Sequence, residues 1–212
     1  MIVLAESNFV LELALQQEQS EEAQRVVDLA EARRLELIIP ACCFAEPCQT
    51  LIRRRRERSA LSRRLQSELQ QLSRSKSFVG RSYASRDLPQ MLAAGDDAES
   101  KGLQDTIDGL IRFCTVHPLT SQVIHDAQRM QVEFGLGPHD ALVFASIDAA
   151  LRGAGEVPKV FINKDSKDFA KFRIRDHLRR YECKLLTDFA AARRFVESAL
   201  AKAAARERPS GA

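Results

Sequence analysis

The sequence has no tryptophan, and none of its apolar runs approaches the ~20 residues that a membrane-spanning helix needs. The lack of a long apolar run argues against an integral membrane protein. The apolar N-terminus carries no basic leader and meets Glu6 early, so we interpret it as a strand of the folded protein and not as a signal peptide. We therefore expect a cytoplasmic protein with no membrane partner.

Cysteine pairs at metal-binding spacing are also missing. The five cysteines are odd in number, include no CxxC pair and fit no zinc spacing. Cys42 and Cys43 are neighbours in the sequence, which suits small buried side chains in a reducing compartment. The pattern gives the cysteines little weight as redox or metal groups.

Two signatures of phosphate chemistry are absent as well. The chain has no Gly-rich phosphate loop and no DxD motif just after its first apolar segment. Their absence weakens the hypothesis of a different phosphohydrolase built on an α/β sheet. The four histidines do not cluster in the sequence. His139, beside Asp140, could contact a substrate, although a capping or surface role is the simpler interpretation.

Charge is distributed very unevenly along the chain, although its net value is only +3. Residues 52–86 contain ten Arg, one Lys and two Glu, a local charge of +9, so the remainder of the chain carries −6. Residues 87–108 contain six acids and one Lys. Blocks of this kind predict an interaction surface or an arm that pairs with itself.

Short apolar segments alternate with amphipathic ones, which predicts an α/β fold with a mostly parallel sheet. We expect a single domain over residues 1–212, with a basic and acidic helical insertion at about 52–114 and loops with a short helix over 73–102. The expected strands are 2–5, 35–40, 114–119, 157–163 and 184–186. The expected helices start at Ser7, Ser20, residues 44–47, Leu103, Thr120 and Pro138, with a last one capped by Asp188.

Four acids occur where such a sheet builds its sites, at the carboxyl ends of strands or at helix starts. They are Glu6, Glu46, Asp140 and Asp165. Crowded carboxylates repel one another and stay ionised only with a cation among them. Oxygen ligands select Mg²⁺ or Mn²⁺ over zinc or copper. This pattern predicts metal-assisted hydrolysis of a phosphodiester.

Each acid also has a structural interpretation. Asp140 and Glu46 could simply stabilise the N-terminal turns of their helices, and in isolation that is the better explanation. Asp165 and Asp168 could form a solvated turn after the apolar segment VFI. Glu6 is the hardest to explain structurally because it interrupts an apolar run. Four acids at four such places together are harder to ascribe to chance.

The order and local context of these segments resemble the PIN-domain family, in particular its VapC-type toxins. The matching segments are AESNFVLEL, IIPACCFAE, GLGPHDALVFASIDAAL and VFINKDSKDF. They cover about residues 1–51 and 115–200, and GLGPHDALVFAS is the most specific of them. The resemblance implies a PIN-like α/β/α sandwich and a metal-dependent ribonuclease. It also raises the possibility of a toxin with an antitoxin-like protein partner.

The resemblance assigns roles to individual residues. The family's four metal-binding acids fall on Glu6, Glu46, Asp140 and Asp165, with Mg²⁺ or Mn²⁺ as the cofactor. Supporting positions fall on Ser7, Asn8, Asn163 and Asp168. The first acid of the family is usually Asp, whereas Glu6 reaches about 1.5 Å further, and metal geometry tolerates only a few tenths of an ångström. A second hypothesis is therefore a PIN-like protein with an impaired metal site that binds RNA or protein.

The basic segment offers a surface for a polyanion. We assign RNA contact to Arg53, Arg54, Arg55, Arg56 and Arg58, because arginines neutralise backbone phosphates. Pairing of this segment with the acidic residues 87–108, or a simply solvated helix face, explains the charges equally well. A stripe of leucines at 61, 65, 69 and 72 could instead support a homodimer.

Overall fold

A five-stranded parallel sheet forms the centre of the molecule, in the order β3-β2-β1-β4-β5. The computed structural model describes residues 1–77, 87–164, 169 and 172–207. The strands are β1 (Ile2–Ala5), β2 (Glu36–Pro40), β3 (Thr115–His117), β4 (Lys159–Ile162) and β5 (Cys183–Leu186). Each strand lies beside neighbours that run in the same direction, so all five carboxyl ends meet at one edge of the sheet.

The central strand β1 explains why the sheet is parallel and covered on both faces. All four of its residues are buried, a continuous apolar pattern typical of strands with helices on both sides. It pairs with β2 through Val3 opposite Leu37 and with β4 through Ala5 opposite Ile162. The residues that follow β1 and β4 therefore lie next to each other at the carboxyl edge.

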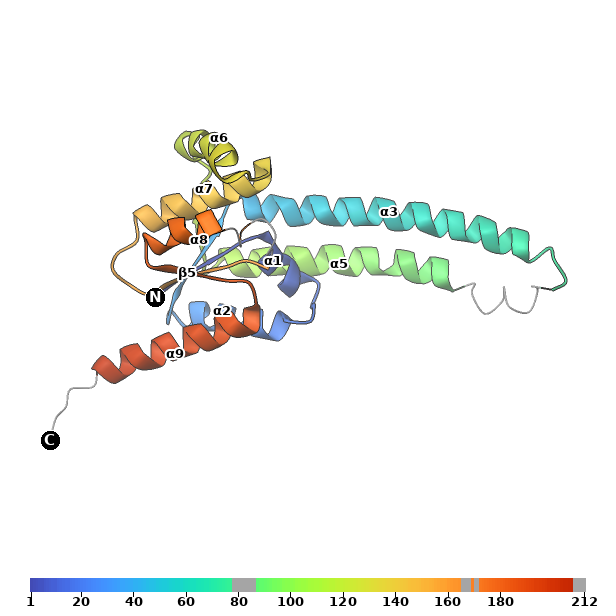
Figure 1. Cartoon of the computed structure of the whole chain (residues 1–212). Coiled ribbons are helices and arrows are strands. Elements are labelled where there is room, and N and C mark those ends of the chain that lie inside the picture. Colours follow the sequence, from blue (N-terminus) through green and yellow to red (C-terminus); the bar gives the residue numbers. More distant parts are fainter. Residues whose placement is uncertain (78–86, 165–168, 170–171, 208–212) are drawn as a thin grey trace.

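Helices cover both faces of the sheet (Figure 1). One face carries α2 (Ser20–Glu31) and α9 (Phe189–Glu207), which pack against each other. The other face carries α6 (Ser121–Phe134), α7 (Pro138–Arg152) and α8 (Phe172–Arg179). The short α1 (Ser7–Ala14) follows β1 and contacts α2, α3 and α5. The expected α/β/α sandwich is confirmed.

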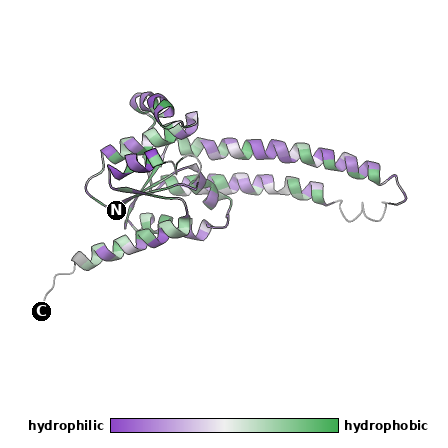
Figure 2. Ribbon diagram, viewed as in Figure 1, coloured by the Kyte–Doolittle hydropathy of each residue, from purple (hydrophilic) through white to green (hydrophobic). Residues whose placement is uncertain are grey.

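Two long antiparallel helices project from the sandwich as an arm (Figure 1). They are α3 (Cys42–Leu72), which has 31 residues, and α5 (Leu88–Ile111). Figure 2 shows that most of α3 is hydrophilic outside the body. Helices were expected in this region and are present. Where loops with a short helix were expected over 73–102, residues 88–102 instead form the first part of α5, which continues to Ile111. The Ser-, Gly- and Asp-rich composition hid a helix that packing against α3 stabilises.

The base of the arm is fixed against α1. Leu103 and Leu110 of α5 belong to the buried core. A Cβ atom added at Gly102 would lie 2.7 Å from the carbonyl oxygen of Ala14, so only glycine allows the two helices to approach this closely. Ser62 of α3 donates a hydrogen bond of 3.0 Å to the carbonyl oxygen of Pro89 further along the arm.

Several expected helix boundaries shift by a residue or more. Ser7 was expected to cap the first helix, but the residue that caps α1 is Glu6. The third helix begins at Cys42, two residues before the expected range. The helix α8 was not expected, because its eight residues carry only two buried apolar side chains, Ile174 and Leu178, between charged ones. No helix in the described part of the chain is long and apolar enough to cross a membrane.

Candidate functional site

The candidate site lies at the carboxyl edge of the sheet, where β1 and β4 end side by side. Glu6 follows β1 directly and Asn163 follows β4 directly. Asn163 is fully buried, and its backbone N–H donates to the carbonyl oxygen of Leu186 at 2.9 Å, which ties the end of β4 to β5. Ser7 is buried and Asn8 is half-buried beside Glu6. The fold therefore brings the first acid and three of its expected supporting residues to one edge.

Glu6 is a buried carboxyl group, only 6% exposed. Its Oε2 accepts a hydrogen bond of 3.0 Å from the backbone N–H of Asn8 and so caps α1. Its Oε1 has no hydrogen-bond partner among the described residues. Burial raises the pKa of Glu6 to about 7, because the hydrogen bonds from Asn8 and the backbone of Lys164 offset it only in part and the nearby charge of Glu46 adds to it.

Glu46 lies one turn into α3 and is paired with His139 of α7. The distance from His139 Nε2 to Glu46 Oε2 is 2.7 Å. The pairing lowers the pKa of Glu46 and raises that of His139, since each charged form favours the other. The sequence placed His139 near the site but gave no signal for this partner, because the two residues lie far apart in the chain.

Asp140 lies in the first turn of α7, immediately after His139. A Cβ atom added at Gly137 would lie 3.2 Å from Asp140 Oδ2, so the carboxylate folds back over the N-terminus of its own helix. Its negative charge contributes to the raised pKa of His139. Electrostatic contacts thus link Glu6 to Glu46, Glu46 to His139, and His139 to Asp140.

A cysteine that the sequence gave little weight borders this cluster. The pKa of the Cys42 thiol is lowered to about 7, chiefly by a hydrogen bond with Cys43 and also by the nearby charge of His139. The pKa of Cys43 is raised, by the same contact and by burial. Cys42 is the first residue of α3, so the helix that carries Glu46 also places a thiol beside the site.

The donors suit a hard cation, although they do not by themselves form a coordination sphere. Glu6, Glu46 and Asp140 offer carboxylate oxygens, and Glu6 Oε1 is buried without a partner among the described residues. Within residues 1–77, 87–164, 169 and 172–207, no group of three or more His, Cys, Asp or Glu is arranged to hold a metal ion. Asp165 and Asp168 lie outside the described residues.

The arginines assigned to RNA contact divide into two groups. Arg58 forms hydrogen bonds of 2.8 and 2.7 Å with Glu99 and one of 3.3 Å with Asp96, and Arg55 lies 3.6 Å from Asp96. These two side chains hold α3 to the acidic helix α5. Three arginines make no ion pair within the part of the chain that the structure describes, namely Arg53, Arg54 and Arg56.

The structure contains a second polar network that was not predicted from the sequence. Asp148 of α7 is fully buried and lies 2.6 Å from His177 Nε2, and it accepts a hydrogen bond of 2.9 Å from Tyr181. Arg152 bonds both Asp148 and Asp126, which joins α6, α7 and α8. Burial works to raise the pKa of Asp148, but the hydrogen bonds from His177 and Tyr181 outweigh it and the pKa lies below its usual value. An acid inside the apolar run LVFASIDAAL was the available signal.

No protein-family model matches the chain, and no curated protein matches it. Among solved structures, the chain is similar to one described as VapBC2 from Rickettsia felis bound to a DNA fragment from their promoter. The identity is 12%, the match covers 88% of this chain and 98% of the other, and the TM-score is 0.44. A similarity this distant carries no inference about function.

Proposed function

We propose that the protein is a PIN-like, Mg²⁺- or Mn²⁺-dependent endoribonuclease that hydrolyses RNA phosphodiester bonds in the cytoplasm. In this proposal Glu6, Glu46, Asp140 and Asp165 hold the metal, with Ser7, Asn8, Asn163 and Asp168 in support. The RNA backbone contacts Arg53, Arg54 and Arg56 of α3, which make no ion pair with the described residues. The metal would supply a water molecule with a lowered pKa as the nucleophile.

The observation that carries the proposal is the environment of Glu6. A buried carboxyl group with a pKa of about 7 and one oxygen without a described partner is costly to keep in the folded protein. Such perturbed acids at the carboxyl edge of a parallel sheet are typical of functional sites. Glu46 and Asp140 lie in the same cluster and supply the further carboxylates that a cation needs.

The residues of the cluster also have roles that do not depend on the cation. Glu6 holds a proton near neutral pH because burial favours its neutral form, and it gives that proton up when positive charge enters the site. His139 orients Glu46 and competes with a cation for its Oε2. Arg53 lies close enough to Glu46 to lower its pKa, so positive charge also reaches the edge of the site from α3.

Calorimetry with Mn²⁺ and Mg²⁺ tests the proposal, with cleavage of a mixed RNA pool measured alongside. The variants are Asp140→Asn and Glu6→Asp, and Asp105→Asn on the exposed side of α5 is the matched control. We expect the wild type and the control to bind metal and cut RNA, and Asp140→Asn to lose both. Metal binding and cleavage that persist in Asp140→Asn would contradict the proposal.

A second candidate function is an RNA- or protein-binding module with an impaired metal site. Two contacts favour it: His139 pairs with Glu46, and Glu6 caps α1. Both carboxyl groups therefore already have a structural role. In this case the wild type neither binds metal nor cuts RNA. A gain of both in Glu6→Asp would then identify the longer side chain as the cause.

The protein partner in this proposal is an antitoxin-like chain or a second copy of the protein. Leu61 and Leu72 of the arm are 53% and 43% exposed, and Leu65 and Leu69 between them are half-buried. An apolar strip of this kind on a helix suits another helix. Light scattering of the purified protein separates the two: a dimer that Leu61→Glu dissociates supports self-association, and a monomer supports a different partner.

A further inference from the structure

A second basic surface covers α8, well away from the arm. Phe172, Arg175 and Arg179 are spaced at i, i+3 and i+7 and therefore lie on one face of the helix. Phe172 is 73% exposed, which is unusual for an aromatic side chain in a folded domain. Ile174 and Leu178, on the opposite face, are fully buried. The helix thus presents an aromatic ring and two guanidinium groups to solvent.

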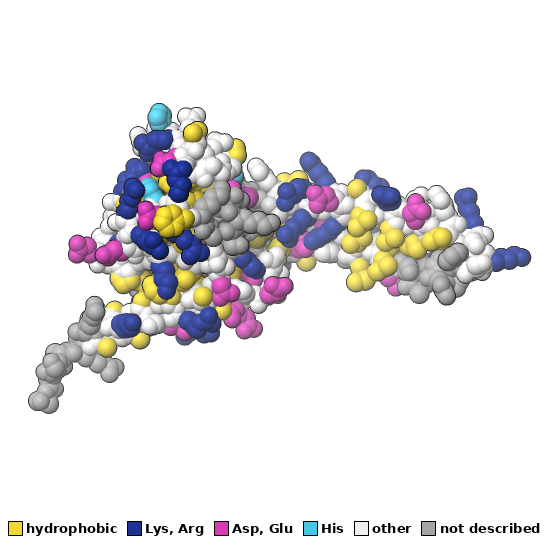
Figure 3. Space-filling view, viewed as in Figure 1, with side chains coloured by type: hydrophobic (Ala, Val, Ile, Leu, Met, Phe, Trp, Pro, Cys, Tyr) yellow, Lys and Arg dark blue, Asp and Glu magenta, His cyan; other side chains and the backbone are white. Residues whose placement is uncertain are grey.

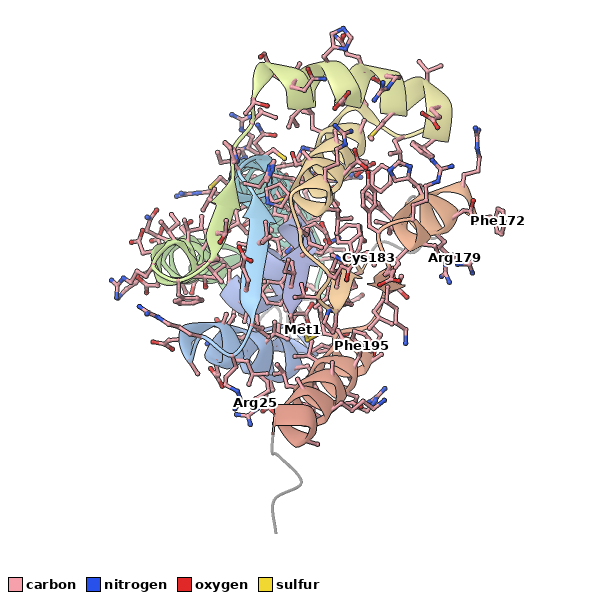
Figure 4. The ribbon with its side chains drawn as sticks, turned by 90° about the vertical axis from the view of Figure 1, so that its left-hand side faces the viewer. Met1, Arg25, Phe172, Arg179, Cys183 and Phe195 are labelled. Atoms are coloured by element: carbon pink, nitrogen blue, oxygen red, sulfur yellow. The ribbon has the colours of Figure 1, made fainter. Side chains whose placement is uncertain are left out.

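The positive charge extends beyond the helix. Residues 172–184 contain five basic and two acidic side chains. Figure 3 shows Lys and Arg side chains gathered around hydrophobic ones on this part of the body. A pocket of about 360 Å³ adjoins the helix, lined by Arg175, Arg179, Glu182, Cys183, Lys184 and Leu185. In Figure 4, Phe172 projects outward from α8, with Arg179 on the same helix. We call Phe172, Arg175, Arg179 and Lys184 the α8 surface.

The cations of the α8 surface are available to a ligand. Arg175 forms no ion pair with any residue that the structure describes, and the ion pair of Arg179 with Asp176 is long, at 3.8 Å, and exposed. Lys184 lies 4.8 Å over the ring of Phe195, a contact that leaves its ammonium group exposed to anions. Exposed pairs of this kind contribute little stability, so stability alone does not explain the cluster.

The helix that carries the α8 surface is fixed to α6 and α7 through His177. His177 lies between Arg175 and Arg179 in the sequence and points inward, where its Nε2 is 2.6 Å from Asp148. Its ring packs edge-to-face against Phe134 and Phe144, with centroid distances of 5.5 and 5.4 Å. A surface that is already ordered loses less conformational entropy when a ligand binds.

We propose that the α8 surface binds single-stranded RNA, with a base stacked on Phe172 and adjacent phosphates on Arg175, Arg179 and Lys184. An exposed ring beside arginines is the arrangement that proteins use for unpaired bases, because every base has a face that can stack. The inference rests on the proposed ribonuclease function and specifies its substrate. Helix α8 is the next described element after β4, whose carboxyl end leads directly into Asn163 of the candidate site.

The test measures RNA binding without cleavage. The full chain with Asp140→Asn binds a fluorescent oligouridine of about 12 nucleotides, and anisotropy gives the affinity as a function of salt. Phe172→Ala should weaken binding about tenfold, and Phe172→Tyr should restore it. Arg175→Gln/Arg179→Gln should lower the slope of log K against log salt by about 1.4. The matched control Arg33→Gln/Arg34→Gln removes the same two positive charges from exposed residues just before β2. It should weaken RNA binding only by the small amount that the lower net charge of the protein explains.

The outcomes separate this inference from the proposed function. If the wild type cuts no RNA but Phe172→Ala still weakens RNA binding, the result supports the α8 surface and contradicts only the proposed nuclease activity. Unchanged affinity in Phe172→Ala overturns the inference, as does a duplex of the same length that competes as well as the single strand. If Phe172→Ala or Arg175→Gln/Arg179→Gln loses binding to phosphatidylserine vesicles but keeps its affinity for RNA, the surface binds membranes. That result also overturns the inference.

Discussion

His139 Nε2 lies 2.7 Å from Glu46 Oε2, so two residues from different helices are joined at the carboxyl edge of the sheet. The pairing raises the pKa of His139 above its usual value. A raised histidine pKa contributes stability below the unfolded value of about 6.5 and loses it as pH rises through the folded pKa. His139 therefore holds Glu46 most firmly in mildly acidic solution.

Replacement of His139 by Gln should strengthen Mn²⁺ binding, because it removes the cation that competes for Glu46. We expect a several-fold gain at pH 6 and a smaller one at pH 8, because His139 loses its proton as the pH rises through its raised pKa. Calorimetry at the two pH values measures this. His125→Gln, on the exposed side of α6, is the matched control. An affinity that falls in His139→Gln would instead make the histidine a ligand or a necessary support.

The second prediction concerns the pH dependence of stability in the metal-free protein. The pKa of Glu6 rises from 4.5 to about 7 on folding, so the folded state prefers the neutral carboxyl group. The free energy of unfolding should therefore fall as pH rises from about 4.5 to 7, by about 3 kcal/mol from this residue. Glu6→Gln should be more stable than the wild type at pH 8 and similar at pH 4.

Urea denaturation in the presence of a chelator measures the effect, with Glu18→Gln on the surface as the control. Equal stability of wild type and Glu6→Gln at pH 8 would show that Glu6 ionises without cost in the folded protein. Addition of Mn²⁺ at pH 8 should then stabilise the wild type and leave Glu6→Gln unchanged, since the cation favours the charged carboxylate.

The third prediction concerns the buried network around Asp148. Asp148→Asn removes the charge that His177 and Arg152 both contact, and should lower the free energy of unfolding by about 3 kcal/mol. The pKa of Asp148 lies below its usual value, so its contribution is present above about pH 4 and is lost as pH falls through the folded pKa. Urea denaturation at pH 7 and pH 3 should show the difference between variant and wild type shrinking in acid. A difference of equal size at both pH values would contradict this account.

The fourth prediction separates the two groups of arginines on α3. Arg58→Gln breaks two hydrogen bonds to Glu99 and should cost about 1 to 2 kcal/mol of stability in the arm, seen as faster hydrogen exchange in α5. Arg56→Gln should leave exchange unchanged and lower the salt slope of RNA binding by about 0.7. Equal effects of the two substitutions on RNA affinity would remove the distinction between them.

Periodicity predicted the sheet and most of its helices, because buried strands and amphipathic helices leave clear apolar patterns. It predicted α5 only from Leu103 onward, because Gly102 and several acids conceal the first part of the helix, which packs against α3 and α1. The position of Glu6 at the carboxyl edge also followed from the sequence. Its pKa did not, because that depends on burial by residues remote in the chain.

The pairs that decide the chemistry were harder to predict. Glu46 and His139, and Asp148 and His177, are separated by long stretches of sequence, and each pair meets only through the packing of two helices. The basic segment could not reveal which arginines face α5. That division depends on the rotation of α3 about its axis, which the charges alone do not determine.

The single helix α3 carries Glu46 near one end and the tip of the arm at the other. Its 31 residues extend about 46 Å, and its proline lies close to the sheet, so no break interrupts the projecting part. Along the arm α3 is braced by α5, which is itself fixed against α1 at Gly102 (Figure 1). A partner bound near the tip of the arm is therefore joined to Glu46 by one unbroken helix that a second helix supports.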